Sequence, residues 1–263
     1  MLAGPPRNPV TLPASLHELV GGRAYEVVWV NQVGGLTLRV GESPASRYVK
    51  WVPAASGGDV SDELERLSWA SAYTPVPRVL DSGNDAEGSW FVTEAIDAQN
   101  AVSPEWRREP RTAIAALGTG LRALHDALPR EDCPFEWSAA SRLAATRARA
   151  DKGEFDEHEW SSEFEGMTLE SAIDELGRAP SEDLVVCHGD ACAPNTLIDA
   201  SGHWVAHLDF DQLGVGDRWA DLAVASWSTV WNYGPGWEDT VYEAYGVAPD
   251  HEKIRYYRLL WEF

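Results

Sequence analysis

The chain has 263 residues, enough to bury a sizeable core as one large domain or as a small lobe joined to a larger one. It carries 21 Lys and Arg against 42 Asp and Glu, so its formal net charge is −21. This charge repels nucleic-acid phosphates and anionic membrane surfaces, and it excludes both as expected partners. It favours a cationic small molecule instead, unless the acidic surface serves only to keep the protein soluble.

The cysteines and the N-terminal residues indicate the compartment. Three cysteines, Cys133, Cys187 and Cys192, form an odd set, which is not the pattern of a disulfide framework. The N-terminal residues lack a basic start followed by an apolar core, and no window approaches about 18 uninterrupted apolar residues. We therefore expect no signal peptide, no membrane span and a cytoplasmic location.

The first hundred or so residues predict a small antiparallel sheet. A proline-rich lead-in precedes a short helix over 15–20, and three β-rich segments follow, separated by glycine-containing turns. These segments are Tyr25–Val30, Leu36–Val40 and residues 48–52. A helix over 59–73 has acidic residues near its start, where the helix dipole favours them. Two further strands fit 78–80 and 89–93.

The pattern changes after residues 97–103, which are polar and predict a hinge between two lobes. The later part is mainly helical, with helices expected over 138–152 and 168–176. An apolar stripe at three- and four-residue steps predicts one long amphipathic helix that packs the core of the second lobe. The stripe consists of Ile114, Leu117, Leu121, Leu124 and Leu128.

A polar turn between two apolar segments is the most informative part of the sequence. Residues 184–186 and 197–198 predict two short strands, with the intervening residues projecting from the connection. Asp190 and Asn195 are five positions apart. Protein kinases use that separation, in H-R-D-x-x-x-x-N, for a catalytic base and a magnesium ligand. Gly189 stands where that loop has Arg.

A second strand and turn place Asp209 19 positions beyond Asp190. A single Asp in such a turn is more often a turn or capping residue than a catalytic group. The joint spacing favours chemistry, because Mg²⁺ takes hard oxygen ligands such as those of Asn195 and Asp209. Asp190 would then remain to orient or deprotonate a hydroxyl nucleophile.

Phosphoryl transfer also needs cations near the nucleotide phosphates. Lys50 lies inside an otherwise apolar strand, and Glu63 near the start of the next helix is its candidate ion-pair partner. Either residue, taken alone, reads as an ordinary solvated charge. The turn of Gln32, Val33, Gly34 and Gly35 could approach phosphates through backbone N–H groups, although two glycines in a hairpin are a weak signal.

With these motifs the chain resembles the aminoglycoside phosphotransferase family, and most closely its enzymes that phosphorylate the 3′-hydroxyl of kanamycin- and neomycin-type drugs. The resemblance covers nearly the whole chain. Its strongest segments are residues 186–195, Leu208 with Asp209, residues 213–218 with Asp221, residues 257–260, and Glu262 with Phe263. Weaker matches are residues 64–69 and 91–95.

The resemblance implies an α+β, bilobal, protein-kinase-like fold. Residues 1–96 would form a small antiparallel-sheet, nucleotide-binding lobe, and residues 97–263 a larger, mainly helical lobe that carries catalysis and substrate binding. It also implies ATP or GTP with Mg²⁺, a cationic small-molecule acceptor, and a monomer or weak dimer.

The resemblance further assigns roles by position. Asp190 would be the catalytic base, Asn195 and Asp209 the metal ligands, Lys50 the phosphate-binding lysine and Glu63 its partner. The turn over 32–35 would cover the phosphates, His188 would brace the catalytic loop, and Asp217 and Asp221 would be structural. The adenine-binding linker would be formed by Thr93, Glu94 and Ala95.

The acceptor side is expected in an acidic loop and near Phe263, which together would form a cation trap. A solvated charge run is the alternative interpretation of the acidic loop. Thirteen tryptophans suggest that part of the cleft is aromatic, although most of them belong in the core. The expected substrate-binding residues are Asp156, Glu157, Glu159, Glu163, Trp261, Glu262 and Phe263.

Three positions depart from the family pattern. Trp261 replaces a carboxylate, and its indole cannot make the charge-assisted hydrogen bond, of roughly 1.5–3 kcal/mol, that an Asp makes to an ammonium group. Asp211 adds negative charge beside the metal site, whereas Gln212 omits a positive one. Val33 stands where many relatives carry a serine.

These departures leave two alternatives to an enzyme of antibiotic resistance. One is a kinase of the same fold that acts on a different antibiotic or on a metabolite hydroxyl. The other is a non-catalytic homologue that only binds nucleotide or drug. A zinc site is disfavoured because the Cys and His residues lack paired C-x-x-C spacing, and no acid-base partner is evident for a nucleophilic cysteine.

Overall fold

The computed structural model describes residues 4–6, 8–43, 45–153 and 160–263. The chain divides into two compact units, Met1–Asp97 and Ala98–Phe263, each with its own strands and helices. This division falls one residue after the lobe boundary expected from the sequence. The functions expected of the two lobes remain predictions.

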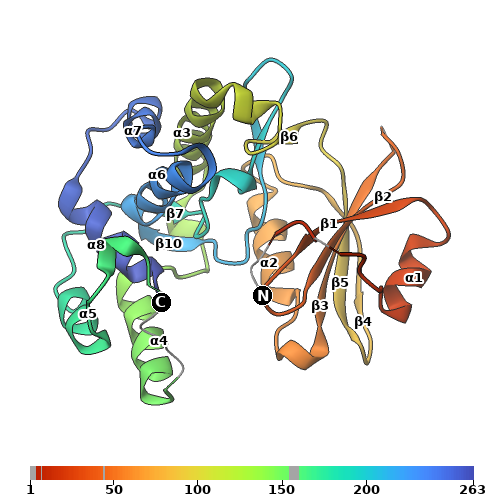
Figure 1. The fold of residues 1–263 in the computed structure, drawn as a ribbon, viewed down its shortest axis with the longest axis horizontal. Helices are drawn as coiled ribbons and strands as arrows, with labels where there is room; N and C mark the ends of the chain where they lie inside the picture. Colours follow the sequence, from red (N-terminus) through yellow and green to blue (C-terminus); the bar gives the residue numbers. More distant parts are fainter. Residues whose placement is uncertain (1–3, 7, 44, 154–159) are drawn as a thin grey trace. The chain divides into compact units, whose positions relative to one another are not determined.

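The N-terminal unit is built on one antiparallel sheet of five strands in the order β1-β2-β3-β5-β4 (Figure 1). The strands are β1 (Tyr25–Val30), β2 (Leu36–Val40), β3 (Arg47–Pro53), β4 (Val79–Asn84) and β5 (Gly88–Glu94). The predicted three-stranded meander and both further strands are confirmed. β4 extends past the predicted residue 80 because its polar residues pair with β5.

Helices lie on opposite sides of this sheet, α1 (Ala14–Val20) on one and α2 (Ser61–Ala70) on the other (Figure 1). Leu16 and Val20 of α1 join a buried cluster with apolar side chains of β2, β3 and β5, among them Leu38. Side chains alternate between the two faces of a strand. Lys50 of β3 therefore points to the face opposite Val49, toward α2. The predicted helix over 59–73 is confirmed but is shorter at both ends.

The C-terminal unit is mainly helical, as predicted. Its helices are α3 (Pro110–Ala127), α4 (Ala139–Asp151), α5 (Leu169–Leu176), α6 (Arg218–Tyr233), α7 (Glu238–Tyr245) and α8 (His251–Trp261). The apolar stripe of α3 is buried from Ile114 to Leu124, and Leu128 is buried just beyond the helix. α3 packs against α6, α7 and the strands that follow Asn195.

Side-chain caps explain where two predicted helices begin. Ser138 accepts a hydrogen bond from the Ser141 N–H at the start of α4. Thr168 and Ser171 form a reciprocal capping box at the start of α5. Each cap satisfies a backbone N–H that has no partner inside the helix.

Two short sheets support the polar turn after residue 187. β7 (Leu184–Cys187) pairs with β10 (Gly214–Asp217), whereas β8 (Thr196–Ile198) lies between β6 (Gln99–Asn100) and β9 (Trp204–His207). The two predicted strands around the turn are confirmed, but they belong to different sheets. β6 lies in the segment predicted as a polar turn, because its pairing with β8 is a long-range contact that local composition does not reveal. None of the helices in the described ranges is long and apolar enough to span a bilayer.

Close packing of α3 against α7 gives a stability prediction. A Cβ at Gly118 would lie 2.5 Å from the Val241 carbonyl oxygen and 2.7 Å from the Ala244 Cβ. We expect Gly118→Ala to lower the free energy of unfolding by about 1–3 kcal/mol, because backbone atoms must shift to relieve the overlap.

The matched control is Gly177→Ala, in which the nearest atom would lie 3.4 Å from the added Cβ and φ is −66°. This change should alter stability by no more than about 0.5 kcal/mol. Denaturant unfolding monitored by circular dichroism measures both variants, and equal losses would contradict the packing argument.

Candidate active site

The loop that carries Asp190 makes a sharp turn at Gly189. Gly189 has φ of +89°, and a Cβ there would lie 2.3 Å from the Gln212 carbonyl oxygen. L-residues with a side chain rarely adopt this conformation, and the close approach leaves no room for one. The position that carries Arg in the protein-kinase loop therefore requires glycine in this chain.

A buried carboxylate on α6 fixes the backbone of the same loop. Asp221 Oδ2 accepts a hydrogen bond from the His188 N–H at 2.6 Å, and Oδ1 accepts one from the Gly189 N–H at 2.9 Å. Asp221 is fully buried. The structural role expected for Asp221 agrees with this geometry, because the carboxylate binds the backbone of the loop.

His125 and Tyr245 extend this network into α3 and α7. His125 Nε2 lies 2.9 Å from Asp221 Oδ2, and its Nδ1 lies 2.8 Å from the Tyr245 hydroxyl. Burial by itself raises the pKa of the Asp221 carboxyl. Hydrogen bonds and charges from His125, His188 and the Gly189 N–H outweigh that effect and hold the pKa below its ordinary value. Asp221 is therefore ionised in the core.

His188 connects the Asp190 loop to the turn at Asp209. Its Nδ1 accepts from the Asp190 N–H at 3.2 Å, so Nε2 carries the proton and donates to the Leu208 carbonyl at 2.9 Å. The imidazole also packs on the Phe210 ring, with centroids 4.8 Å apart. These contacts agree with the bracing role expected for His188.

Asp190 and Asn195 are in direct contact. Asn195 Nδ2 donates to the Asp190 carbonyl oxygen and to Asp190 Oδ2, both at 3.0 Å. Asp190 Oδ1 is shielded from solvent and accepts no hydrogen bond from the described residues. Burial raises the pKa of Asp190, and the nearby Asp209 charge raises it further, against the opposing effects of Cys192, His188 and Asn195. A carboxylate whose pKa is raised takes up a proton more readily than an ordinary aspartate.

The residues around Asp190 fit a magnesium ion. Asn195 uses only its amide nitrogen in the two bonds to Asp190, which leaves its side-chain carbonyl oxygen for another role. Asp209 has φ of +64°, a strained backbone conformation for an aspartate that is typical of functional sites. An amide oxygen and a carboxylate are hard ligands of the kind that Mg²⁺ takes together with phosphates and water.

In the N-terminal unit, Lys50 and Glu63 form the ion pair that the sequence predicts. Lys50 Nζ lies 2.6 Å from Glu63 Oε2, and the Glu63 side chain is only 7% exposed. Lys50 is held on β3 between Thr37 of β2 and Phe91 of β5. The sheet and α2 therefore fix both ends of the pair.

Comparison with known proteins identifies the family of the chain. Residues 15–257 match the model of the phosphotransferase enzyme family. The aminoglycoside 3′-phosphotransferase of Streptomyces fradiae is 38% identical over 230 residues, which cover 82% of this chain and 85% of that protein.

The chain belongs to the aminoglycoside phosphotransferase family. Among solved structures, an aminoglycoside-3′-phosphotransferase of type VIII matches with a TM-score of 0.80 and 33% identity, over 94% of this chain and 97% of that one. A Streptomyces rimosus aminoglycoside phosphotransferase in complex with ADP and streptomycin matches with a TM-score of 0.74 and 26% identity, over 94% and 95%. The family and the protein-kinase-like fold class predicted from the motifs are confirmed.

The backbone N–H groups of the glycine turn over 32–35 form hydrogen bonds with the preceding residue, Asn31. Asn31 Oδ1 accepts from the Val33 N–H at 3.1 Å and from the Gly35 N–H at 2.6 Å, and the Gly34 N–H donates to the Asn31 carbonyl at 3.2 Å. From the sequence we expect these N–H groups to face phosphates, whereas in the structure the side chain of Asn31 binds two of them. A signal was present, since Asn before a glycine turn commonly bonds the backbone two residues on.

The segment expected to contact adenine is likewise engaged in the sheet. The Glu94 N–H donates to the Arg78 carbonyl at 3.0 Å, and the Ala95 N–H donates to the Ser46 carbonyl at 3.2 Å. The Glu94 carboxylate pairs with the Arg78 guanidinium, and Thr93 is buried. Adenine contacts at Thr93, Glu94 and Ala95 remain a prediction, and they would use groups other than these two N–H donors.

Several expected acceptor-binding residues have partners within the chain. Glu163 Oε2 lies 3.1 Å from Arg258 Nη1, and the Glu262 carboxylate accepts from the Ser161 N–H at 3.2 Å. Phe263 packs edge-on against Trp160 and accepts a hydrogen bond from Arg149 through its backbone oxygen. Asp156, Glu157 and Glu159 lie outside the described residues. Trp261 is half-buried at the end of α8.

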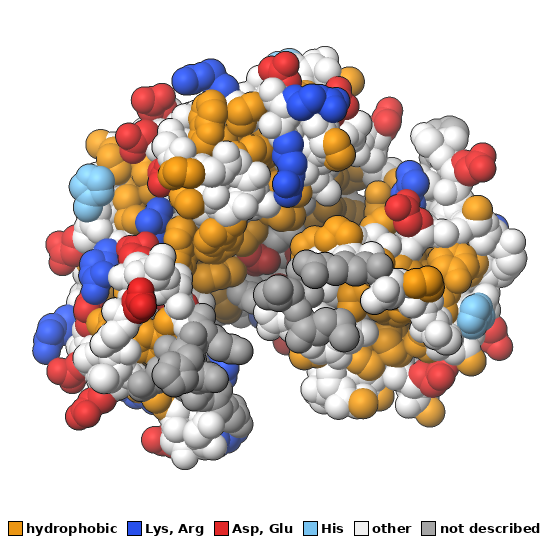
Figure 2. Space-filling view, viewed as in Figure 1, with side chains coloured by type: hydrophobic (Ala, Val, Ile, Leu, Met, Phe, Trp, Pro, Cys, Tyr) orange, Lys and Arg blue, Asp and Glu red, His pale blue; other side chains and the backbone are white. Residues whose placement is uncertain are grey.

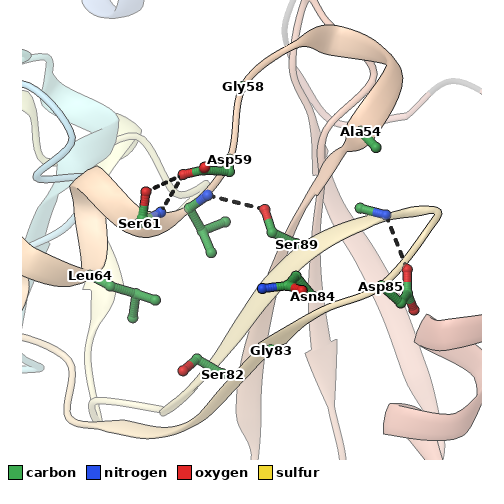
Figure 3. A pocket seen from close by; sticks show the side chains of 12 residues that line it. Ala54, Gly58, Asp59, Ser61, Leu64, Ser82, Gly83, Asn84, Asp85 and Ser89 are labelled. Atoms are coloured by element: carbon green, nitrogen blue, oxygen red, sulfur yellow. Dashed lines mark hydrogen bonds between the residues drawn. The ribbon is translucent and has the colours of Figure 1, made fainter.

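A cavity of about 330 Å³ lies at the start of α2 and against the β4–β5 hairpin (Figure 3). Asp59 and Ser61 line it from one side, and Ser82, Asn84 and Ser89 from the strands. None of the residues predicted to bind nucleotide lines this cavity. It is therefore separate from the Lys50–Glu63 pair, although α2 borders both.

The cysteines near the loop are protonated. The Cys187 thiol is buried and donates to the Asp217 carbonyl, and burial raises the pKa of Cys187 and of Cys192 well above the ordinary value for a thiol. These environments disfavour a thiolate nucleophile. Within the described ranges, no group of three or more His, Cys, Asp or Glu residues could hold a metal ion.

The Asp221 network yields a prediction about stability and pH. Asp221→Asn removes the charge that accepts from His125 and two backbone N–H groups, so we expect it to lower the free energy of unfolding at pH 7 by about 3 kcal/mol. The folded-state pKa of Asp221 lies below its ordinary value. Its contribution is therefore present above about pH 4 and is lost as the pH falls through the folded-state pKa.

The difference in unfolding free energy between the parent and Asp221→Asn should accordingly narrow below about pH 4. Denaturant titrations between pH 7 and pH 3 measure this difference. The control is Asp174→Asn, at a side chain that is 78% exposed, which should stay within about 0.5 kcal/mol of the parent. A difference that stays constant into acid would contradict the assignment of the charge to Asp221.

Proposed function

We propose that the protein is an ATP-dependent O-phosphotransferase that moves the γ-phosphate to a hydroxyl of an aminoglycoside-type antibiotic and thereby confers resistance. The observation that supports this most directly is the position and hydrogen bonding of the Asp190 carboxylate. Its loop is anchored by Asp221, and one carboxylate oxygen accepts no hydrogen bond from the described residues. Membership of the aminoglycoside phosphotransferase family supplies the reaction class.

Asp190 would act as the base. Its carboxylate accepts the proton of the acceptor hydroxyl, whose oxygen forms a bond to the γ-phosphorus while the bond to the ADP oxygen breaks. The proton then passes from Asp190 to solvent. The raised pKa of Asp190 favours the transfer, because a base is most effective when its pKa approaches the working pH.

Asn195 and Asp209 would hold the magnesium ion, which neutralises charge on the phosphates when it is bound. Lys50 would bind a nucleotide phosphate, and Glu63 would position Lys50 through the ion pair of 2.6 Å. Asn31 would have to release Val33 and Gly35 before their N–H groups could contact phosphate. ATP or GTP as the phosphate donor, a monomer or weak dimer, and a cytoplasmic location complete the proposal.

A second candidate is a kinase of the same fold that phosphorylates a different antibiotic or a metabolite hydroxyl. The engagement of Glu163 by Arg258 and of Glu262 by the Ser161 N–H favours it. Two carboxylates of the expected cation trap are thereby less available to ammonium groups. A non-catalytic homologue is disfavoured because Lys50, Glu63, Asp190, Asn195 and Asp209 are all present.

A substrate screen monitored by ADP release decides between these functions. Purified protein with ATP and Mg²⁺ is expected to release ADP with at least one aminoglycoside. ADP release only with metabolite hydroxyls would favour the second candidate. Nucleotide or drug binding without any ADP release would favour the non-catalytic homologue.

Asp190→Asn is expected to lower kcat by about 10²- to 10⁴-fold, with the KM for ATP little changed, because the amide cannot take the proton. The control is Asp199→Asn, in the turn that follows β8. Asp199 accepts backbone N–H bonds from Ser201 and His203, which an Asn oxygen can also accept. Full turnover by Asp190→Asn would refute its role as the base.

A further inference from the structure

Two tryptophans on successive turns of α6 pack against each other in a tilted arrangement. The rings of Trp227 and Trp231 have centroids 5.1 Å apart and an interplanar angle of 44°. Trp227 is only 7% exposed, whereas Trp231 is 51% exposed. Hydrophobic side chains also gather on the face of the C-terminal unit over α6 and its neighbours (Figure 2). The pair thus presents one large aromatic ring to solvent on a buried aromatic support.

Ser228, which lies between the two tryptophans on α6, is hydrogen-bonded to the loop that carries Asp190. Ser228 Oγ accepts from the Ala193 N–H at 2.9 Å, and the Ser228 hydroxyl also interacts with the Cys192 thiol. The Cys192 thiol in turn interacts with the Asp190 carboxylate. Residues three apart lie on the same side of a helix, so Trp231 lies on the side of α6 that carries Ser228 and its bond to the Asp190 loop.

Trp227 is held on its other sides by residues of α8 and of the segment before α5. The Phe164 ring meets it edge-on at 6.3 Å, and the Arg258 guanidinium lies 5.5 Å from its centroid. Arg258 is paired with Glu163 and also donates to Ser226 Oγ. These contacts hold Trp227, on which Trp231 packs, in place. The ion pair neutralises the charges of Arg258 and Glu163. The surface next to the loop is thus rigid and aromatic, with an acidic residue that is already paired.

We propose that Trp231, supported by Trp227, binds the acceptor by stacking on the apolar face of one of its sugar rings. The proposal rests on the proposed phosphotransferase function and names how that site selects its substrate. Sugar rings carry C–H groups on their faces that pack on indole, and a rigid indole loses little entropy on binding. Acceptors with a ring that can lie flat on Trp231 would be preferred, and part of their affinity would not depend on charge.

The test compares Trp231→Ala and Trp231→Phe with the parent enzyme, with kanamycin A and streptomycin as probes. Trp231→Ala should raise the KM of the preferred probe at least ~10-fold, with the KM for ATP unchanged. Trp231→Phe should stay within about 3-fold of the parent, because a smaller ring still stacks. Circular dichroism and thermal unfolding check that both variants are folded.

The matched control is Tyr73→Ala, in the N-terminal unit. Tyr73 is 40% exposed and stacks on Trp69 with the same 5.1 Å centroid distance as the α6 pair. Removing this ring should leave both KM values unchanged. If Tyr73→Ala raises the acceptor KM as much as Trp231→Ala, the effect belongs to general loss of exposed aromatic surface and the proposal is wrong.

Equilibrium binding of the same two probes by calorimetry, with ADP and Mg²⁺ present, separates this proposal from the proposed function. If the parent binds a probe without phosphorylating it, the phosphotransferase assignment fails for that probe, and weaker binding to Trp231→Ala still supports stacking. Unchanged binding in Trp231→Ala, or no binding of either probe by the parent, overturns the proposal. The factor by which Trp231→Ala weakens binding should be the same at about 0.05 and 0.5 M salt, because stacking is not screened. A factor that disappears at the higher salt concentration would assign the effect of Trp231 to charge and contradict the proposal.

Discussion

The ionised carboxylate of Asp221, buried in the core of the C-terminal unit, is the constraint on which the candidate active site depends. A buried charge is costly unless it is fully hydrogen-bonded, and Asp221 meets this condition by binding two loop N–H groups and the imidazole of His125. Tyr245 then holds His125 from α7. Three helices thus meet at one carboxylate, and any movement of the loop would leave that charge without its partners.

The buried charge of Asp221 also positions the group that would carry out the chemistry. Because Asp221 accepts hydrogen bonds from the backbone N–H groups of His188 and Gly189, the turn can hold Asp190 with one oxygen unused by the described residues. Burial then raises the pKa of Asp190. In the N-terminal unit, the Lys50–Glu63 pair follows the same logic, since a mostly buried carboxylate fixes a cation whose position a flexible side chain would not maintain. In both units a carboxylate positions a group that would take part in phosphoryl transfer.

Under the proposed stacking on Trp231, the acceptor side would follow a different physical principle from the one that the acidic composition suggests. Glu163 is neutralised by Arg258, and Glu262 binds the Ser161 N–H, so these two carboxylates organise the protein itself. The exposed ring of Trp231 packs on Trp227, which the same Arg258 contacts, and Ser228 of the same helix is bonded to the Asp190 loop. Selection by an aromatic surface depends on the shape and the apolar faces of the acceptor, whereas selection by carboxylates depends on its charge.

The sequence by itself determined the family, the fold class and most of the strands and helices as far as β9, and it predicted the residues of the reaction, because these follow from local periodicity and from short motifs such as Asp190 with Asn195. It also predicted the ion pair of Lys50 with Glu63. Only the tertiary structure decided which polar groups are hydrogen-bonded or ion-paired with one another. Hydrogen bonds between distant elements leave no local pattern in the sequence. Asn31 bonds the glycine turn, Arg258 takes Glu163, and Asp221 with His125 holds the loop. The sequence therefore specified the chemistry of the site, whereas long-range packing decided which of its polar groups remain for substrate.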